Sequence, residues 1–218
     1  MSTTGYRHLS TYLNTSRCVI IEMLENRGYD VSSVSSFTPF TNITDDMENM
    51  SIKLEKNGKE LIQVYYEVTS SRTNNKKLSK RIEDIVAKRS ESDKSKELTI
   101  VFLVCDEMTP SVKEAVRILS AKYGVFIQIF PIRHLMFNVT KHKSVPKHVR
   151  IKKDEYGPYL SDFLESLHIE TLDNLPKILD SDPVAMFIGL RPGDMCKITR
   201  PSQSAGKHVV YRYCISEK

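Results

Sequence analysis

The strongest constraint on the fold is a regular alternation of strand and helix patterns between residues 61 and 130. Segments 61–68, 98–105 and 125–130 are rich in β-branched and aromatic residues, as strands are. Two sets of apolar residues at helical spacing lie between them: Leu78, Ile82, Ile85 and Val86, then Val112, Ala115, Val116 and Leu119. This order predicts an α/β domain with a sheet that contains parallel neighbours and has flanking helices.

Further patterns complete this first domain. An apolar stripe with steps of three and four predicts an amphipathic helix over about residues 6–27, and Gly28 suits its left-handed end. Residues 29–50 are polar and predict a loop with at most a short helix. Before the helix that follows segment 98–105, Thr109 suits the N-cap and Pro110 the first turn, where the N–H that proline lacks is not needed.

The character of the chain changes near residue 140, where we place the boundary between domains 1–140 and 141–218. Residues 141–153 carry six lysines and arginines and no acid, which suits either a linker that contacts an acidic partner or a solvated hinge. The short elements expected after it are a helix over about 154–167, a helix capped by Asp182-Pro183, a turn at Arg191–Asp194, and strands over 195–199 and 209–215. The second domain is therefore predicted to be a small α+β domain.

Composition narrows the class of protein. With 40% hydrophobic and 27% charged residues, the chain can bury a core as ordinary globular proteins do. The longest unbroken apolar run, Ile100–Cys105, is far shorter than the roughly 20 residues of a membrane span, and the polar start lacks a signal-peptide core. The four cysteines form no Cys-x-x-Cys pair, so we expect small buried thiols in a reducing compartment rather than zinc ligands or disulfides.

Patterns that would indicate catalysis are missing. The sequence has no Walker loop, no Gly-x-Gly-x-x-Gly and no Gly-x-Ser-x-Gly elbow. A metal-dependent nuclease of the restriction-endonuclease type would use an acidic-x-Lys triplet, and no Asp or Glu here has a lysine two residues later. His142, His148 and His208 lie beside no nucleophile at a diagnostic spacing. We therefore expect no catalytic residue, no metal and no cofactor.

Two features suit an anionic neighbour, and each has an ordinary alternative. The helix start at Thr109-Pro110-Ser111 would present free N–H groups and a positive dipole end to a DNA phosphate, or it is simply a cap. Between Arg72 and Lys96, nine Lys and Arg face four Asp and Glu, which is also typical of a solvated surface. Few aromatic residues lie there, so stacking on single-stranded bases is not indicated. The formal net charge of +5 is compatible with a nucleic-acid neighbour.

An ordered series of motifs runs through the C-terminal domain. It consists of His142-x-x-Val145-Pro146-x-His148, Leu175-Pro176-x-Ile178, Asp182-Pro183-Val184-Ala185, Gly189, Arg191-x-Gly193-Asp194, Lys197-Ile198-x-Arg200, Ser202, Ala205-Gly206 and Tyr211-Arg212. Over about residues 142–213 this series resembles the fifth-largest subunit shared by the nuclear RNA polymerases, and it is similar to the smaller archaeal counterpart of that subunit. Arg27-Gly28-Tyr29 and Met108-Thr109-Pro110-Ser111 are similar to N-terminal motifs of that family, with Val112 in place of an alanine. Between residues 30 and 97 little of the family pattern is present.

This resemblance implies a non-catalytic subunit of a multisubunit DNA-directed RNA polymerase. It implies that the C-terminal domain docks on the largest polymerase subunit and that the N-terminal domain forms part of the lower jaw, near downstream duplex DNA. Thr109, Pro110 and Ser111 would then lie near the DNA backbone, with no sequence preference. Other polymerase subunits, and transcription factors as a further class, would be partners. The location would be the nucleus or, for a viral chain, the virion and the host cytoplasm or nucleus.

The resemblance also assigns assembly contacts to the C-terminal motifs. The residues concerned are His142, Val145, Pro146, His148, Asp182, Pro183, Arg191, Gly193, Arg200, Ala205, Gly206, Tyr211 and Arg212. Val145-Pro146 favours an extended segment suited to a strand or to edge docking, and the guanidinium groups of Arg200 and Arg212 could bind carboxylates or carbonyls of a partner. Two other hypotheses remain at this point. One is a free transcription cofactor or DNA-binding adaptor with a polymerase-docking tail, and the other is a nuclease with a basic edge.

Overall fold

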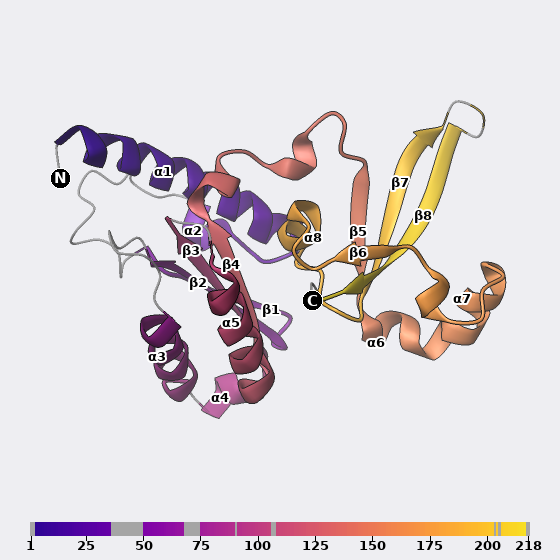
Figure 1. Ribbon diagram of the computed structural model, residues 1–218, viewed down its shortest axis with the longest axis horizontal. Coiled ribbons are helices and arrows are strands. Elements are labelled where there is room, and N and C mark those ends of the chain that lie inside the picture. Colours follow the sequence, from indigo (N-terminus) through magenta and orange to yellow (C-terminus); the bar gives the residue numbers. More distant parts are fainter. Residues whose placement is uncertain are drawn as a thin grey trace. The chain divides into compact units, whose positions relative to one another are not determined.

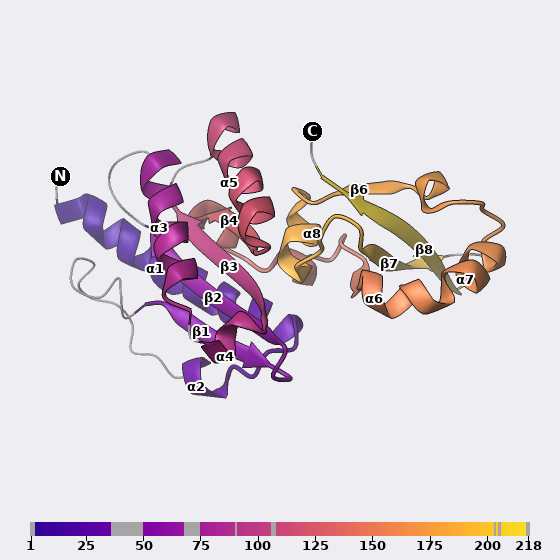
Figure 2. The same cartoon turned by 90° about the horizontal axis from the view of Figure 1, so that it is seen from below.

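The computed structural model describes residues 3–35, 50–67, 75–89, 91–105, 108–202, 204 and 206–216 (Figures 1 and 2). Most of the loop predicted over residues 29–50 lies outside these ranges. The chain divides into two compact units, Met1–Phe137 and Asn138–Lys218, which we call the N-terminal and the C-terminal unit. Each unit contains a four-stranded mixed sheet with helices, so the chain is a mixed α/β protein.

The sheet of the N-terminal unit has the strand order β1-β2-β3-β4. β1 pairs antiparallel with β2, whereas β2, β3 and β4 are parallel neighbours, as the alternation of strands and helices predicts. The elements are α1 (Thr3–Asn26), α2 (Ser32–Ser35), β1 (Ile52–Lys56), β2 (Glu60–Glu67), α3 (Asn75–Ala87), α4 (Glu91–Lys94), β3 (Glu97–Val104), α5 (Pro110–Tyr123), β4 (Phe126–Pro131) and the 3-10 helix η1 (Ile132–Leu135).

Helices lie on both faces of this sheet, with α1 on one face and α3 and α5 on the other (Figure 1). Because side chains alternate along a strand, a central strand between two helical layers must be apolar at every position. β3 meets this requirement, since every residue from Leu98 to Val104 is buried. The unbroken apolar run in the sequence is thus explained by burial on both faces.

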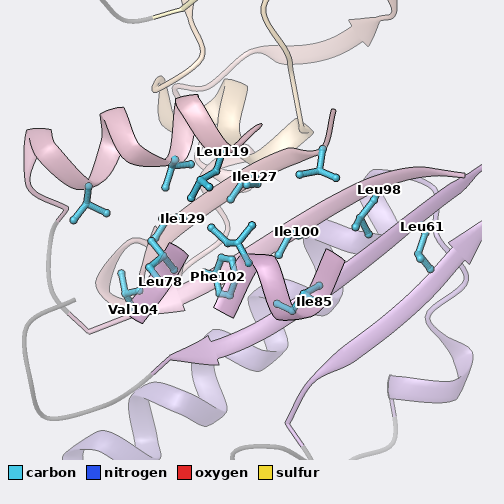
Figure 3. Close-up of a cluster of buried hydrophobic side chains, with 14 residues drawn as sticks. Leu61, Leu78, Ile85, Leu98, Ile100, Phe102, Val104, Leu119, Ile127 and Ile129 are labelled. Carbon is cyan, nitrogen blue, oxygen red and sulfur yellow. The ribbon is translucent and has the colours of Figure 1, made fainter. Parts of the chain in front are cut away.

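The core under α3 and α5 is built from the apolar stripes that the sequence predicts (Figure 3). Phe102 of β3 has no exposed surface and stacks on Tyr65 of β2, with 5.8 Å between ring centroids. The helices contribute Leu78, Ile82 and Ile85 from α3 and Val112, Val116 and Leu119 from α5. On this face the packed cluster includes residues of β2, β3 and β4 but none of β1.

Two arginines tie α1 to the opposite face of the sheet. Arg17 Nη1 donates to the carbonyl oxygen of Met50, just before β1, at 2.5 Å. Arg27 Nη2, one residue beyond the helix, donates to Gln128 Oε1 of β4 at 2.7 Å. One bond ends two residues before the edge strand β1 and the other ends on the edge strand β4, so they hold α1 at both edges of the sheet. Gly28 follows with φ of +82°, the left-handed conformation expected at the end of this helix.

The sheet of the C-terminal unit has the order β5-β7-β8-β6. β5 and β8 both pair antiparallel with β7, and β6 pairs parallel with β8. The elements are η2 (Val139–Lys141), β5 (Lys147–Ile151), α6 (Lys153–Tyr156), η3 (Gly157–Tyr159), α7 (Leu160–Ser166), η4 (Leu172–Asn174), β6 (Lys177–Leu179), α8 (Pro183–Ile188), β7 (Met195–Ser202) and β8 (Gly206–Ile215). This is an α+β arrangement, as predicted.

Two small cores lie on the two faces of this second sheet. The cluster that includes α8 consists of Ile178, Ala185, Ile188, Leu190, Cys196, Ile198 and Cys214. The cluster that includes α6 consists of Tyr156, Leu175 and Met195, with Phe163, Tyr211 and Tyr213 among the side chains packed against it. Phe163 of α7 meets the Tyr211 ring edge-on, with 4.9 Å between centroids.

Several sequence predictions need correction. The linker or hinge predicted over residues 141–153 instead contains β5, which belongs to the second sheet. The single helix predicted over 154–167 is broken into α6, η3 and α7, because Pro158 cannot donate the backbone hydrogen bond of a continuing α-helix. The short strands β1 and β6 are not predicted from the sequence, and β7 and β8 are both longer than predicted.

The core under α3 and α5 generates a stability prediction. We expect Phe102→Ala to destabilise the N-terminal unit by about 3–5 kcal/mol, because it leaves a cavity between two helices and the sheet. Amide hydrogen exchange measures this unit by unit, and protection should fall in β2–β4 but not in β7–β8. Ile118→Ala on α5 is the control, since Ile118 is 58% exposed and its loss should change stability by less than about 0.5 kcal/mol. Equal effects of the two changes would contradict this core.

Candidate assembly and nucleic-acid interface

One buried carboxylate holds several motifs of the C-terminal unit together. Asp194 lies just before β7, and its side chain is 6% exposed. Its Oδ2 accepts from Arg150 Nε of β5 at 2.6 Å and from the backbone N–H of Arg191 at 3.0 Å. Its Oδ1 accepts from the backbone N–H of Lys153, the first residue of α6, at 3.2 Å. Two segments distant in sequence, residues 150–153 and 191–194, thus meet at one charge.

The turn that carries Asp194 has the geometry that its sequence requires. Asp194 N–H donates to the Arg191 carbonyl at 2.9 Å, and Gly193 has φ of +94°. Proline at the second position and glycine with positive φ at the third are the pattern of a type II turn. Tyr156 of α6 donates from its hydroxyl to the Gly193 carbonyl at 2.5 Å, and burial raises the pKa of this hydroxyl, which keeps it a donor.

The start of α8 is capped as predicted. Asp182 Oδ1 accepts from the backbone N–H groups of Val184 at 2.9 Å and Ala185 at 3.1 Å, with Pro183 in the first turn. The helix ends at Gly189 with φ of +71°. These bonds give Asp182 a local structural role, and Pro183 is the exposed residue of the pair.

The residues before β5 form a turn. Val145 N–H donates to the His142 carbonyl at 2.9 Å, and the exposed His142 accepts from Ser144 N–H at Nδ1, at 3.2 Å. His148 Nδ1 lies 2.7 Å from the carbonyl oxygen of Pro146. Val145 and Pro146 are half-buried and lead directly into the edge strand β5.

The two arginines predicted for assembly differ in their surroundings. Arg200 of β7 is exposed and stands opposite His208 on β8. Arg212 of β8 is half-buried, and its Nη1 donates to the Lys177 carbonyl of β6 at 3.2 Å. Gly206 has φ of +68° where β8 begins, whereas Ala205 lies outside the described residues. Tyr211 packs against Phe163, as described above.

The sheet of the C-terminal unit is strongly cationic. Strands β5, β7 and β8 contain no Asp or Glu, and their six Lys and Arg are Lys147, Arg150, Lys197, Arg200, Lys207 and Arg212. Among the described residues, Arg150 is the one of these six that lies within ion-pair distance of an acid, the buried Asp194. Val149 and Val209 lie on the same face as the Lys197 and Thr199 that pair with them, and they remain 42% and 41% exposed. This face therefore combines exposed aliphatic groups with Lys147, Lys197 and Lys207, whereas Arg150, Arg200 and Arg212 lie on the opposite face.

Cysteine chemistry does not contribute to the surface of this unit. Cys196 and Cys214 are buried, and burial raises the pKa of their thiols to about 11 and about 12. Both are therefore neutral packing residues near neutral pH. Cys18 of α1 is exposed.

The start of α5 differs in part from its prediction. Thr109 occupies the N-cap position and Pro110 the first turn, but the Thr109 side chain makes no capping hydrogen bond. Instead, the Thr109 carbonyl accepts from the N–H groups of Val112 and Lys113 at 2.9 and 3.1 Å. Thr109, Pro110 and Ser111 are all exposed, and the first turn contains no acidic residue.

Two further findings concern metal ions and membranes. Among the described residues, no three His, Cys, Asp or Glu side chains lie close enough together to hold a metal ion. No helix within the described ranges is long and apolar enough to cross a bilayer.

Comparison with known proteins assigns the C-terminal unit. Residues 137–214 match the family described as RNA polymerase Rpb5, C-terminal domain. The chain is therefore Rpb5-like over its C-terminal unit. It is 26% identical over 199 residues to the DNA-directed RNA polymerases I, II, and III subunit rpabc1 of Dictyostelium discoideum, an alignment that covers 91% of this chain and 95% of that protein. The subunit RPABC1 of Caenorhabditis elegans is 35% identical over 116 residues, which cover 53% of this chain and 51% of that protein.

The buried ion pair of this Rpb5-like chain generates a second prediction. We expect Asp194→Ala to destabilise the C-terminal unit by about 3–5 kcal/mol, because Arg150 and two backbone N–H groups lose their acceptor. Urea unfolding followed by hydrogen exchange in β7 and β8 measures the loss. Asp173→Ala is the matched control, since Asp173 is 87% exposed in its ion pair with Lys177 and should contribute less than about 1 kcal/mol. Similar losses for both variants would refute the central role of Asp194.

Proposed function

We propose that this Rpb5-like chain is a non-catalytic subunit of a multisubunit DNA-directed RNA polymerase. The observation that carries the proposal is the family match over residues 137–214, which coincides with the C-terminal unit, residues 138–218. The similarity to rpabc1, a polymerase subunit by name, extends over 91% of the chain and therefore includes the N-terminal unit. A nuclear location follows from the same relatives, and the virion or host cytoplasm is the alternative for a viral chain.

In this proposal the C-terminal unit docks on the largest polymerase subunit. Its small, divided core is of the kind that gains stability by burial against a larger partner. Strands β5, β7 and β8 contain no acid. On one face of the sheet, Val149 and Val209 supply exposed apolar area beside Lys147, Lys197 and Lys207, and on the other face Arg200 supplies an exposed positive charge. An acidic, partly apolar surface on the partner would complement both features.

The N-terminal unit forms part of the jaw near downstream duplex DNA. Supporting this, the N-terminal end of α5 is exposed at Thr109, Pro110 and Ser111 and has no acid in its first turn. The positive end of the helix dipole would therefore meet a phosphate without repulsion. A free transcription cofactor with the same tail is the competing function, and gel filtration of native extract separates the two, because a cofactor would elute as a free monomer.

The assembly proposal predicts a selective effect of charge reversal. Arg200→Glu should reduce co-purification of the chain with the largest polymerase subunit, because Arg200 is exposed on a strand without acids and its loss removes no packing. Quantitative mass spectrometry of a tagged chain gives the yield, and thermal unfolding of the isolated chain gives the stability. We expect the yield of recovered complex to fall about tenfold or more, which corresponds to the loss of a charge pair that contributes more than about 1.4 kcal/mol to binding. The unfolding temperature of the isolated chain should not change.

Arg133→Glu is the matched control, an exposed arginine in the N-terminal unit with the same change of charge. It should leave the yield of complex unchanged. Arg212→Glu is unsuitable for this purpose, because Arg212 bonds to the Lys177 carbonyl and its loss should weaken fold and assembly together. If the unaltered chain never co-purifies with a large polymerase subunit, the proposed function is wrong.

The jaw proposal predicts weak, sequence-independent binding of duplex DNA. Two phosphate contacts would lower the affinity about tenfold between 50 and 200 mM salt. Ser111→Asp should weaken this binding without destabilising α5, since an acid in the first turn favours the helix dipole while it repels phosphate. Fluorescence anisotropy with two unrelated duplexes measures both effects, and Ala121→Asp near the other end of α5 is the charge-matched control. Tight, sequence-selective binding at physiological salt would contradict the jaw.

A further inference from the structure

The N-terminal unit contains a polar pocket next to β1, on the sheet face that α3 and α5 cover over the other strands. The row of paired residues Lys53, Gln63, Ile100 and Ile127 crosses β1, β2, β3 and β4 on one face. Ile100 and Ile127 are packed beneath the helices, whereas Lys53 of β1 has a side chain that is 58% exposed. Residues of β1 and β2, of the end of α3 and of the short α4 line a pocket of about 320 Å³.

The lining of this pocket is mainly cationic. Four basic side chains line it, Lys53, Arg81, Lys88 and Arg89, against the two acids Asp84 and Asp93. Three of the four, Arg81, Lys88 and Arg89, belong to the basic stretch between Arg72 and Lys96.

The acid deepest in the pocket is already neutralised. Asp93 has a side chain that is 10% exposed, and its carboxylate lies 2.8 Å from Lys53 Nζ and 3.6 Å from Lys96 Nζ. Arg89 Nη2 donates to the carbonyl oxygens of Asp93 at 2.5 Å and Lys96 at 2.8 Å, contacts that orient the guanidinium but leave its charge uncompensated. In the part of the chain that the structure describes, Lys88 has no acidic partner within ion-pair distance. Arg81 Nε lies 3.3 Å from Glu67 Oε1, so Lys88 and Arg89 carry the positive charge that the pocket leaves uncompensated.

The aromatic side chains of this pocket are already in contact with other residues. Of the two tyrosines that line it, Tyr66 is 5% exposed. Tyr65 stacks on Phe102 with 5.8 Å between centroids, and the Arg81 guanidinium carbon lies over the Tyr65 ring, 5.5 Å from its centroid. These contacts disfavour stacking of the Tyr65 ring on a nucleobase. Recognition must then come from lysine and arginine, which bind phosphate oxygens through charge-assisted hydrogen bonds.

We propose that this pocket binds a small phosphate chain, supplied as inorganic pyrophosphate or as the phosphates of a nucleotide. Its volume lies at the lower end of the range for small-molecule sites, which suits two or three linked phosphates better than a larger ligand. Its floor is recessed, since Gln63 and Asp93 are 8% and 7% exposed, and this favours a free anion over the rigid backbone of a duplex. Its lining residues all belong to the N-terminal unit and none belongs to α5, and the proposal does not rest on the proposed function.

Isothermal titration calorimetry of the full chain with inorganic pyrophosphate, and separately with ATP, tests the site. We expect saturable binding with one site per chain and similar affinities for both ligands, because only the phosphates are recognised. Lys88→Glu should weaken binding about tenfold or more, the effect of losing a hydrogen bond to a charged group. Since Lys88 has no ion pair in the described structure, the thermal unfolding midpoint should not change.

Lys80→Glu is the matched control, because Lys80 is exposed on the same helix, outside the pocket. It should change the affinity by less than about twofold, as expected for a screened surface charge. Equal weakening by Lys80→Glu and Lys88→Glu would show diffuse attraction and overturn the proposal. The proposal is also overturned if pyrophosphate shows no saturable binding. It is overturned as well if duplex DNA displaces pyrophosphate and Lys88→Glu weakens the binding of DNA as much as that of pyrophosphate. None of these results would bear on co-purification with polymerase, so failure here leaves the assembly proposal standing.

Discussion

The C-terminal unit depends on the buried carboxylate of Asp194. A charge in so small a core is stable only if several donors meet it, and here Arg150, Lys153 and Arg191 each supply one. The cost of desolvating both charges offsets much of the attraction in such an ion pair. The ion pair therefore mainly determines which segments pack together and contributes less to the net stability of the unit. Any arrangement that parts β5 from the turn before β7 leaves a buried charge without a partner. The three-residue strand β6 and the broken α6–α7 segment can be this short because the turn and the edge strand are already fixed to each other.

In each unit, part of the sheet is not covered by helices or not paired with a further strand, and that part is exposed to solvent. In the N-terminal unit, α3 and α5 pack over β2, β3 and β4, so one side of β1 stays open and Lys53 points into the pocket. In the C-terminal unit, β5 pairs with β7 only as far as Thr199, while the β7–β8 ladder continues to Ser202 and Gly206. Both uncovered places carry lysine. A lysine on an open edge discourages pairing with another strand and at the same time attracts anions.

Patterns that local physics determines could be predicted from the sequence. The parallel strands β2–β4, the stripes of α3 and α5, the Asp182 cap and the Arg191–Asp194 turn all follow from periodicity or from proline and glycine chemistry. β1 was missed because three of its five residues are charged, and only pairing with β2 makes it a strand. The sequence does not predict β5, because Arg150 and its basic neighbours are typical of an exposed linker. The acceptor of Arg150, Asp194, lies 44 residues away in the sequence, so only the fold brings the two side chains together. The pocket depends on contacts among four elements, and no local pattern contains it.

Charge within the C-terminal unit is separated far more than the small net charge of the chain suggests. Strands β5, β7 and β8 hold six Lys and Arg and no acid, whereas residues 154–173, which contain α7, hold six Asp and Glu and no Lys or Arg. Because positive and negative charges lie on different elements, the charge distribution of the unit is asymmetric. A partner with a fixed charge pattern would therefore bind the unit more favourably in one orientation than in the reverse orientation. Salt at physiological strength screens exposed charges beyond about 8 Å, so this preference acts only at close approach. Exposed Val149 and Val209 then stabilise the orientation that charge has selected, since apolar burial has no direction of its own. A module built in this way can be small and still dock in a single manner.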